Sequence, residues 1–288
     1  MEQIKLFIEV TRVKNPIGYL LLFWPCAWGL TIAYDFEKKV DTYLFYLILF
    51  FIGSVLMRSA GCIVNDIIDK KFDQKVFRTQ NRPIAKNKIT VFRGLLYSML
   101  LCFLALIVLL QFNKLTIILA LCSMPLAFTY PLMKRYTYWP QLFLGITFNY
   151  GLLLGWISIS DDMITIPFIL YFGAIFWTLG YDTIYGFQDI KDDEIIGLKS
   201  TSIKFKNSPK KFLFLCYLIF SISLFIVGIK LNFEKIYFLI LLLALFHLFI
   251  IQVYKLNIND TFNCLKTFKS NNFLASIIFV SLILGKTI

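Results

Sequence analysis

The chain contains 288 residues, of which 59% are hydrophobic and 16% are charged. A soluble domain is about a quarter charged, so this composition excludes an ordinary soluble protein and indicates one that lies in a lipid bilayer. The formal net charge of +12 is typical of proteins that bind nucleic acids or anionic membrane surfaces, and the placement of the basic residues decides between these partners.

About nine segments are apolar and long enough to cross the hydrocarbon core of a membrane. Their apolar runs are continuous, which favours helices over the alternating strands of a membrane barrel. We therefore predict an all-α integral membrane protein, a single domain over residues 1–288. Pro25 and Pro125 predict kinks in the first and fourth helices. In chain order the segments are about 17–34, 43–64, 94–111, 115–131, 140–157, 165–185, 211–229, 235–254 and 270–287.

The basic residues gather on one side of this arrangement. Of the 29 Lys and Arg residues, 22 lie in the N-terminal segment and in alternate connections, which include two long polar loops at about 65–93 and 186–211. By the positive-inside rule, the N-terminus and both loops face the cytoplasm, and the basic excess meets lipid head groups rather than nucleic acid. With Glu2 and Glu9, the N-terminal residues resemble neither a signal peptide nor a transit peptide, which favours a bacterial inner membrane.

The first long loop opens with carboxylates, in the string RSAGCIVNDIIDKKFDQ at 58–74. If the preceding helix continues, Asp66, Asp69 and Asp73 lie at i, i+3 and i+7 on one face, and Asn65 pairs with Asp69 at i, i+4. Three like charges on one stripe repel each other, and a divalent cation removes that repulsion. Magnesium takes carboxylate oxygens together with substrate phosphate oxygens, so these residues are candidate catalytic and metal-binding groups.

The second long loop opens in the same way, with GYDTIYGFQDIKDDEIIGLKST at 180–201. Asp192 and Glu194 point away from its main helical face and are expected to be solvated. A solvated, mixed-charge loop is the alternative for either motif alone, but two motifs at helix ends on one membrane side favour a shared site. The predicted face, whose deepest carboxylate lies at the edge of an apolar span, consists of Asp182, Tyr185, Asp189 and Asp193.

Several cations lie near these carboxylates. Arg58 precedes Asn65 by seven residues, which places it on the same face about 10 Å deeper in the bilayer. It is either a buried partner for Asp66 or Asp182, or a group that receives an anionic substrate, and we favour the substrate. Other cations that suit diphosphate oxygens are Arg78, Arg82, Lys134, Arg135 and Lys199.

Two further features have structural interpretations. His247 lies in the apolar string LLLALFHLFI, where a hydrogen-bonded packing residue is favoured over a proton relay. The six cysteines are scattered and mostly within apolar segments, so they predict neither a disulfide nor a zinc site.

These strings resemble the UbiA superfamily of intramembrane prenyltransferases. NDIIDKKFD matches the NDxxDxxxD signature, and QDIKDD carries the second motif, DxxxD, as Asp189 to Asp193. RTQNRPI, YPLMKRYTYWPQLFLG, YDTIYGFQDIKDDEIIGLKSTS and NPIGYLLLFWP are similar to the 4-hydroxybenzoate polyprenyltransferase branch, over about 12–205. The string RVKNPIGY departs from the branch, which usually has Arg or Asp before the Pro, and leaves Arg12 and Lys14 as alternative equivalents of that cation.

The resemblance implies a helix bundle around a central cavity, with polar cytoplasmic caps and a lateral opening for an isoprenoid tail. It implies that the polyprenyl group of a polyprenyl diphosphate is transferred to the carbon ortho to the hydroxyl of 4-hydroxybenzoate, in ubiquinone biosynthesis. Tyr185 is the candidate for shielding the allylic cation, and Arg58 for binding the benzoate carboxylate or the diphosphate. The implied ligands of Mg²⁺, which would bridge the diphosphate, are Asn65, Asp69, Asp73, Asp189 and Asp193.

Two alternatives remain at this stage. One is a member of the same superfamily with another acceptor, such as homogentisate, dihydroxynaphthoate, haem or chlorophyllide. The other is an ion-coupled transporter or cation channel that uses the intramembrane acids as an ion path. Most of the acids lie at helix ends beside phosphate-type cations rather than at the bilayer midplane, which favours the enzyme. The extended strings favour 4-hydroxybenzoate as the acceptor.

Overall fold

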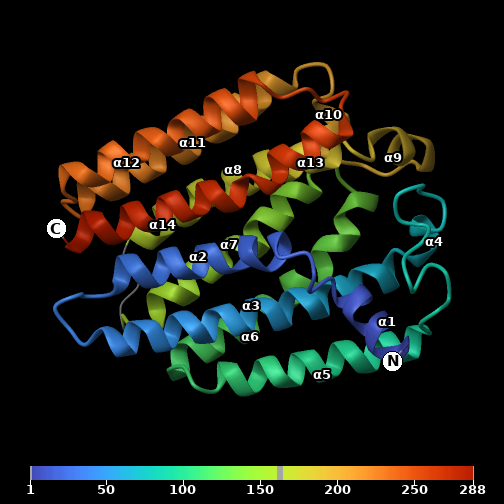
Figure 1. Ribbon diagram of the computed structural model, residues 1–288, viewed down its shortest axis with the longest axis horizontal. Helices are drawn as coiled ribbons and strands as arrows, with labels where there is room; N and C mark the ends of the chain where they lie inside the picture. Colours follow the sequence, from blue (N-terminus) through green and yellow to red (C-terminus); the bar gives the residue numbers. More distant parts are fainter. Residues whose placement is uncertain (1, 161–164, 288) are drawn as a thin grey trace.

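The computed structural model describes residues 2–160 and 165–287, and all secondary structure in these ranges is helical (Figure 1). The elements in chain order are α1 (Glu2–Thr11), α2 (Ile17–Ala33), α3 (Val40–Ile68), α4 (Lys70–Asp73), α5 (Val91–Leu109), α6 (Lys114–Thr129), the 3-10 helix η1 (Tyr130–Arg135), α7 (Pro140–Ile157), α8 (Thr165–Gly186), α9 (Ile190–Ile196), α10 (Thr201–Lys204), α11 (Pro209–Lys230), α12 (Lys235–Phe246), the π-helix η2 (His247–Tyr254), α13 (Thr261–Lys269) and α14 (Asn271–Thr287).

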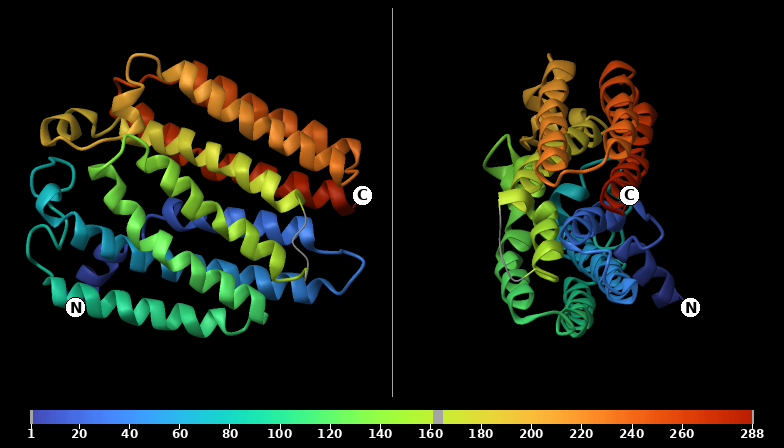
Figure 2. Two further views of the ribbon diagram at one scale, coloured as in Figure 1. Left: turned by 180° about the vertical axis from the view of Figure 1, so that it is seen from behind. Right: turned by 90° about the vertical axis from the view of Figure 1, so that its left-hand side faces the viewer.

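The long helices run side by side along the longest axis of the molecule (Figure 1). Helices α11, α12 and α14 lie along one edge of the bundle and α5 along the opposite edge, with α2, α7 and α8 between them (Figure 2). The short helices α1, α4, α9, α10 and α13 gather at one end, which we call the cap end. The C-terminus lies at the other end, so both predicted polar loops and the N-terminal helix share one side of the bundle.

All nine predicted segments are helical, and within the described residues six helices are long and apolar enough to cross a membrane. Lys114–Arg135, Lys235–Tyr254 and Thr261–Lys286 each join two successive elements, and α3, α5 and α11 complete the six. Helix α2 is apolar but shorter, with 17 residues. The protein is therefore a multi-pass helical membrane protein, whereas nine crossings remain a prediction.

Helices α7 and α8 pack largely inside the bundle. Half or more of their residues are buried, and Asn149 of α7 donates a 2.7 Å hydrogen bond to Thr178 of α8. Helix α7 also packs closely on α2, because an added Cβ at Gly155 would overlap the backbone of Cys26 and lie 2.7 Å from the nitrogen of Leu30. Small residues permit such close helix packing in membranes.

The two carboxylate motifs lie where long helices end. Helix α3 ends at Ile68, where Asp69 has φ −93° and ψ 2°, so the helix does not continue unbroken through Asp73 but resumes as the short α4. Helix α8 ends at Gly186, and Asp189 caps the separate short helix α9. The short helices α4 and α9 that follow these breaks both lie at the cap end of the bundle (Figure 1). Pro25 and Pro125 each lie inside a continuous helix.

Candidate active site

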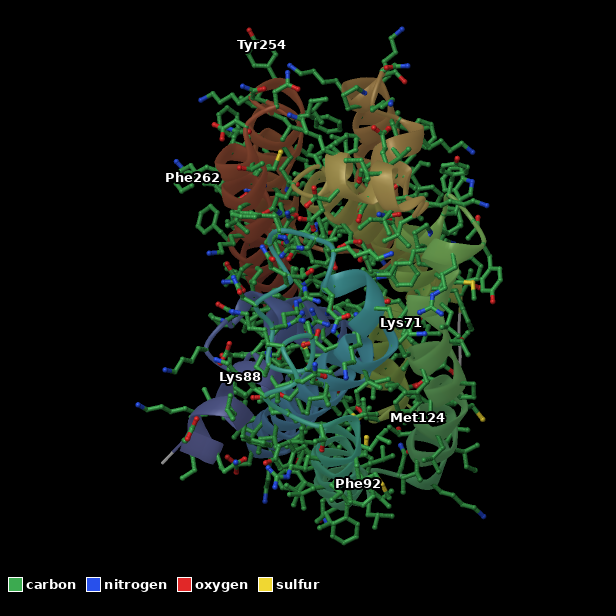
Figure 3. The ribbon with its side chains drawn as sticks, turned by 90° about the vertical axis from the view of Figure 1, so that its right-hand side faces the viewer. Lys71, Lys88, Phe92, Met124, Tyr254 and Phe262 are labelled. Atoms are coloured by element: carbon green, nitrogen blue, oxygen red, sulfur yellow. The ribbon has the colours of Figure 1, made fainter. Side chains whose placement is uncertain are left out.

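A cavity of about 510 Å³ opens among the helices at the cap end. Figure 3 looks onto this end, where Lys71 and Lys88 of the first polar loop lie near the middle of the view and Tyr254 near its top. The cavity wall comes from the connection between α1 and α2, from α3, η1, α7 and α8, from both polar loops and from α13. The segments that form it are thus far apart in the sequence.

Most of the predicted site residues meet in this cavity. Five metal-ligand candidates line it, and so do the deep carboxylate, the aromatic candidate and five of the cations. The carboxylates and Asn65 come from the α3–α4 segment on one side and from the α8–α9 segment on the other. Arg58 also lies on α3, and the other cations come from the two polar loops and η1. These lining residues are Arg58, Asn65, Asp69, Asp73, Arg78, Arg82, Lys134, Asp182, Tyr185, Asp189, Asp193 and Lys199.

Asp66 lies beneath the cavity wall rather than in it. It follows Asn65 directly on α3, so its side chain points about 100° away around the helix. It is 2% exposed, forms an ion pair with Arg12 and accepts a 3.2 Å hydrogen bond from Arg82. Asp66 and Asp73 nevertheless lie on a common side, because the same nitrogen of Arg82 contacts both carboxylates, but of the three predicted residues only Asp69 and Asp73 line the cavity. Asp66 anchors two basic residues that do line the cavity.

Arg135 likewise lies outside the cavity lining. Its Nη2 atom donates a 2.9 Å hydrogen bond to the carbonyl oxygen of Ile68, and its guanidinium lies 5.2 Å from the ring centre of Phe72. The same nitrogen is 3.9 Å from Asp69. Arg135 therefore stabilises the end of α3 from outside, where a cation also interacts favourably with the C-terminal helix dipole. The sequence predicts Arg135 as a substrate-binding residue, whereas the structure places it outside the cavity lining.

The first carboxylate motif retains oxygen atoms without hydrogen-bond partners in the described structure. Asp69 forms an ion pair with Lys134 through one oxygen, and Asp73 accepts a 2.7 Å hydrogen bond from Arg82. Within the described residues, Oδ1 of Asp69 and Oδ1 of Asn65 are buried and have no hydrogen-bond partner. Buried oxygens are normally paired, so these two oxygens at the cavity wall point to a ligand that supplies positive charge or a donor.

The second motif is tied to the first loop by Arg78. Its Nε atom donates a 2.7 Å hydrogen bond to Oδ1 of Asp189, and its Nη2 atom contacts Oδ2 of the same carboxylate. Its Nη1 atom donates a 2.9 Å hydrogen bond to the hydroxyl of Tyr185. The backbone nitrogen of Phe77 also donates to Asp192 at 3.2 Å. Asp192 is partly exposed and outside the cavity lining, in keeping with its expected solvation, and it also helps to join the two loops.

The remaining predicted residues of the second loop have different environments. Glu194 forms a 2.6 Å ion pair with Lys206 outside the cavity. Lys199 lines the cavity, where its backbone nitrogen donates to the carbonyl of Lys134 at 2.9 Å and its ammonium donates to the carbonyl of Tyr136 at 3.2 Å. The second loop is thereby fixed to η1 as well as to the first loop.

Burial changes the proton affinity of carboxylates in the caps. Burial and the nearby negative charge of Asp189 together raise the pKa of Asp193 to about 6. Burial also raises the pKa of Asp69, although Lys134 opposes the change. A divalent cation bound beside Asp69 and Asp193 would lower both pKa values again, because its positive charge favours the ionised carboxylates.

Arg58 and Asp182 lie at the deep end of the cavity. The guanidinium of Arg58 is 5.5 Å from the ring centre of Phe148, and its Nε atom is buried without a hydrogen-bond partner in the described part of the chain. Gly18 makes room for it, because an added Cβ would lie 2.7 Å from that nitrogen. Among residues 2–160 and 165–287, no ion pair links Arg58 to Asp66 or Asp182. A guanidinium in this setting suits an anionic ligand.

Several lining residues were not among the predicted site residues. Of the two alternative cations near the N-terminus, Arg12 lines the cavity, while Lys14 is exposed. Helix α13 forms a third cap, whose N-terminus is held by Asp260. Its amphipathic pattern is the sequence signal that would have revealed it, but it lies beside a more apolar span. The lining residues without a prediction include Asn15, Tyr130, Gln141, Tyr181, Leu265, Phe268 and Lys269.

This cap-end cavity, lined by two carboxylate motifs and their cations within a helical membrane bundle, defines a class of intramembrane enzyme. The chain belongs to the UbiA prenyltransferase family, whose family model matches residues 22–278. The resemblance seen in the sequence motifs is thus confirmed.

Curated relatives are similar over nearly the whole chain. The mitochondrial 4-hydroxybenzoate polyprenyltransferase of Bos taurus is 44% identical, over 97% of this chain and 75% of the relative. Its human counterpart is 42% identical over 97% of this chain and 75% of the relative. The 4-hydroxybenzoate geranyltransferase 1 of Lithospermum erythrorhizon is 37% identical over 99% of this chain and 92% of the relative.

Solved structures share the fold at lower identity. A UbiA homolog from Aeropyrum pernix K1 has a TM-score of 0.77 and 20% identity, with 93% of this chain and 98% of that chain covered. A UbiA homolog from Archaeoglobus fulgidus bound to GPP and Mg²⁺ has a TM-score of 0.68 and 18% identity, with 98% and 100% covered. These likenesses confirm the predicted all-α membrane architecture.

Proposed function

We propose that this protein transfers a polyprenyl group from a polyprenyl diphosphate to the ring carbon ortho to the hydroxyl of 4-hydroxybenzoate, in ubiquinone biosynthesis. The observation that carries the proposal is the cavity in which two carboxylate motifs face each other among cations. The choice of acceptor is supported by relatives of 44% and 37% identity whose names both specify 4-hydroxybenzoate. Transfer of a prenyl group is the activity after which the whole family is named.

We propose that Mg²⁺ is held by Asn65, Asp69, Asp73, Asp189 and Asp193. The unpartnered oxygens of Asn65 and Asp69 support this assignment, because hard oxygen ligands suit magnesium. The described residues contain no preformed group of three or more His, Cys, Asp or Glu side chains that could hold a metal. This fits a site completed by diphosphate oxygens, with carboxylates that pair with basic side chains until the substrate arrives.

The basic residues of the cavity have a clear task in this scheme. Arg78, Arg82 and Lys134 exchange their carboxylate partners for diphosphate oxygens, and Lys199 contributes a further positive charge. When bound, Mg²⁺ supplies positive charge that stabilises the departing diphosphate. The C1–O bond of the polyprenyl diphosphate then breaks, and its electron pair leaves with the diphosphate. Fixed cations around the leaving group lower the energy of that step without reorganisation of solvent.

The deep end of the cavity suits the acceptor. The guanidinium of Arg58 binds the benzoate carboxylate, which orients the ring toward the allylic cation. The ring carbon ortho to the hydroxyl forms the new C–C bond, and its proton leaves to restore the aromatic ring. The carboxylate of Asp182, which lines the same end, receives that proton. The ring of Tyr185 shields the cation from water, and an aromatic face tolerates positive charge.

A second cavity of about 240 Å³ suits the isoprenoid tail. It lies among α2, α3, α5, α6 and α7, and its wall is mostly apolar. Arg58, Tyr130 and Phe148 line both cavities, so the two spaces are adjacent at the level proposed for the acceptor. A polyprenyl chain in the second cavity would place its diphosphate at the cap end.

We further infer that the cap end faces the side of the membrane on which the basic residues gather, the cytoplasmic side of a bacterial cell. The names of the animal relatives place them in mitochondria, so similarity to them adds no support for a bacterial inner membrane. Lys88 is an exposed residue of the first loop. A membrane-impermeant thiol reagent should label Lys88→Cys only when it is added on the cytoplasmic side of the membrane. Labelling from the opposite side would contradict the orientation.

The function is tested with membranes that contain the protein, 4-hydroxybenzoate, a polyprenyl diphosphate and Mg²⁺. Prenylated 4-hydroxybenzoate is expected, and its absence, or full activity in EDTA, would contradict the proposal. Asp69→Asn and Asp189→Asn should each abolish most activity, whereas Glu194→Gln, outside the cavity, should retain it. Homogentisate, dihydroxynaphthoate and haem, offered at equal concentration, identify the alternative acceptors.

A further inference from the structure

A buried polar network lies behind α8, on the side away from the cavity. Four side chains that are 0% exposed form its centre: Trp177 of α8, Tyr217 of α11, Gln252 of η2 and Asn271 of α14. Three of them come from the part of the chain after residue 205, where the sequence showed only apolar spans. In a bilayer interior, such polar side chains are stable only when they are paired.

Gln252 and Asn271 pair through both ends of their amide groups. The Nε2 atom of Gln252 donates to Oδ1 of Asn271 at 2.8 Å, and the Nδ2 atom of Asn271 donates to Oε1 of Gln252 at 3.2 Å. Tyr217 donates its hydroxyl to the same Oε1 at 2.6 Å, and Trp177 donates its indole N–H to Oδ1 of Asn271 at 2.8 Å. His247 extends the network, with Nδ1 3.2 Å from Nε2 of Gln252.

The π-helix η2 gives Gln252 its inward position. Residues His247–Tyr254 continue the rod of α12 with wider turns, as shown by the 2.9 Å hydrogen bond from the nitrogen of Lys255 to the carbonyl of Ile250. Such turns are uncommon and recur at functional sites. Here the wider turns direct an amide into the bundle at the level where α13 meets α14.

The network touches the residues that form the cavity wall. The ring of Trp177 lies 4.9 Å from the ring of Tyr181, and Tyr217 packs on Gly180, where an added Cβ would be 2.5 Å from its ring. Asn271 donates a 3.1 Å hydrogen bond to the carbonyl of Phe268. Tyr181 and Phe268 both line the cavity.

Phe268 in turn packs against the aromatic side of the site. Its ring centre is 4.6 Å from that of Tyr185 and 5.8 Å from that of Tyr181. Phe268, Tyr185 and Tyr181 thus form an aromatic wall, which contacts Trp177 and Asn271 of the network directly. The wall stands between the cavity and the C-terminal helices, and it includes the residue proposed to shield the allylic cation.

We infer that Gln252 is a positioning residue for the prenyl transfer: through Asn271 it holds Phe268 against Tyr185, so that the allylic cation meets the acceptor ring rather than water. The inference rests on the proposed function. Loss of this support lets water reach the cation. The water oxygen then forms the bond to C1 and loses a proton, which gives a polyprenyl alcohol in place of the prenylated acceptor.

The test measures the ratio of polyprenyl alcohol to prenylated 4-hydroxybenzoate, because this ratio does not depend on how much enzyme is folded. Gln252→Met keeps the length of the side chain and removes its hydrogen bonds, and it should raise the ratio on the order of tenfold. Ser281→Ala is the matched control, since within the described part of the chain this buried hydroxyl bonds only to the carbonyl of Ile278 in its own helix, at 2.7 Å. Its ratio should equal that of the wild type.

A second variant identifies the route of the effect. Phe268→Leu should raise the same ratio, and the double variant with Gln252→Met should raise it no further, because the two residues act in one chain of contacts. Additive effects, or an unchanged ratio in Gln252→Met, would overturn the inference. If Gln252→Met does not fold, Tyr217→Phe, which removes only the hydroxyl that donates to Gln252 at 2.6 Å, decides by the same ratio. A wild type without prenylated product would instead contradict the proposed function.

Discussion

Arg58 offers the sharpest test of how the acceptor is bound. If its guanidinium binds the benzoate carboxylate, Arg58→Ala removes a charge-assisted, two-point contact in a site shielded from water. Its Nε atom is buried and unpartnered in the described structure, so a bound carboxylate satisfies a group that otherwise lacks a partner. Such contacts contribute about 2–3 kcal/mol, which corresponds to a roughly 30- to 150-fold lower kcat/KM.

The assay compares 4-hydroxybenzoate with 4-hydroxybenzamide, which has the same ring and hydroxyl but no negative charge. The wild type should prefer the benzoate by about the factor above, and Arg58→Ala should lose the preference. Arg58→Lys keeps the charge without the planar fork, and an intermediate preference is expected. The ratio of the two substrates is insensitive to protein yield. An unchanged ratio in Arg58→Ala would refute this role for Arg58.

Three further predictions concern packing, the metal and the tail. Gly155→Ala should lower the apparent Tm by roughly 2–4 °C, because the added Cβ meets backbone atoms of α2. Gly61→Ala should leave the Tm unchanged, because an added Cβ there has nothing within 4 Å. Equal shifts of Tm in the two variants would contradict the packing argument. The Mg²⁺ concentration for half-maximal rate should rise as pH falls through about 6, since burial raises the pKa of Asp193 to about 6 and only the ionised carboxylate binds metal; Asp193→Asn should remove this dependence. Phe112→Ala should widen the second cavity and increase kcat/KM for long over short polyprenyl diphosphates, as measured by product chromatography.

The sequence predicted the fold class and most of the charged residues that line the cavity, for identifiable reasons. Continuous apolar runs specify membrane helices, and all nine predicted segments are helical. The motif strings identified residues from two distant loops, and twelve of the predicted residues line one cavity. His247 is buried and 3.0 Å from the hydroxyl of Ser270, as its interpretation as a hydrogen-bonded packing residue anticipated.

The structure differs from the predictions where tertiary contacts override the local sequence pattern. Neither Gly nor Pro marks the end of α3, and contacts of Asp69 and Ile68 with Lys134 and Arg135 stabilise it instead. The contact of Asp192 with the backbone nitrogen of Phe77 has no local sequence signal, because the two residues are more than a hundred positions apart. Hydropathy also overlooks buried polar networks, since residues such as Gln252 are few among apolar neighbours.

The ion pairs of Arg78 with Asp189 and of Lys134 with Asp69 make the binding of the metal and the binding of the diphosphate depend on each other. A divalent cation alone would have to displace Arg78 and Lys134 from their carboxylates, and a diphosphate alone would have to draw the same cations away and leave bare acids behind. When both arrive together, each carboxylate gains a metal and each basic side chain gains a phosphate oxygen. Each ligand therefore raises the affinity for the other by the same factor. Magnesium alone, or a diphosphate-like anion alone, would then leave the ion pairs of Arg78 and Lys134 intact.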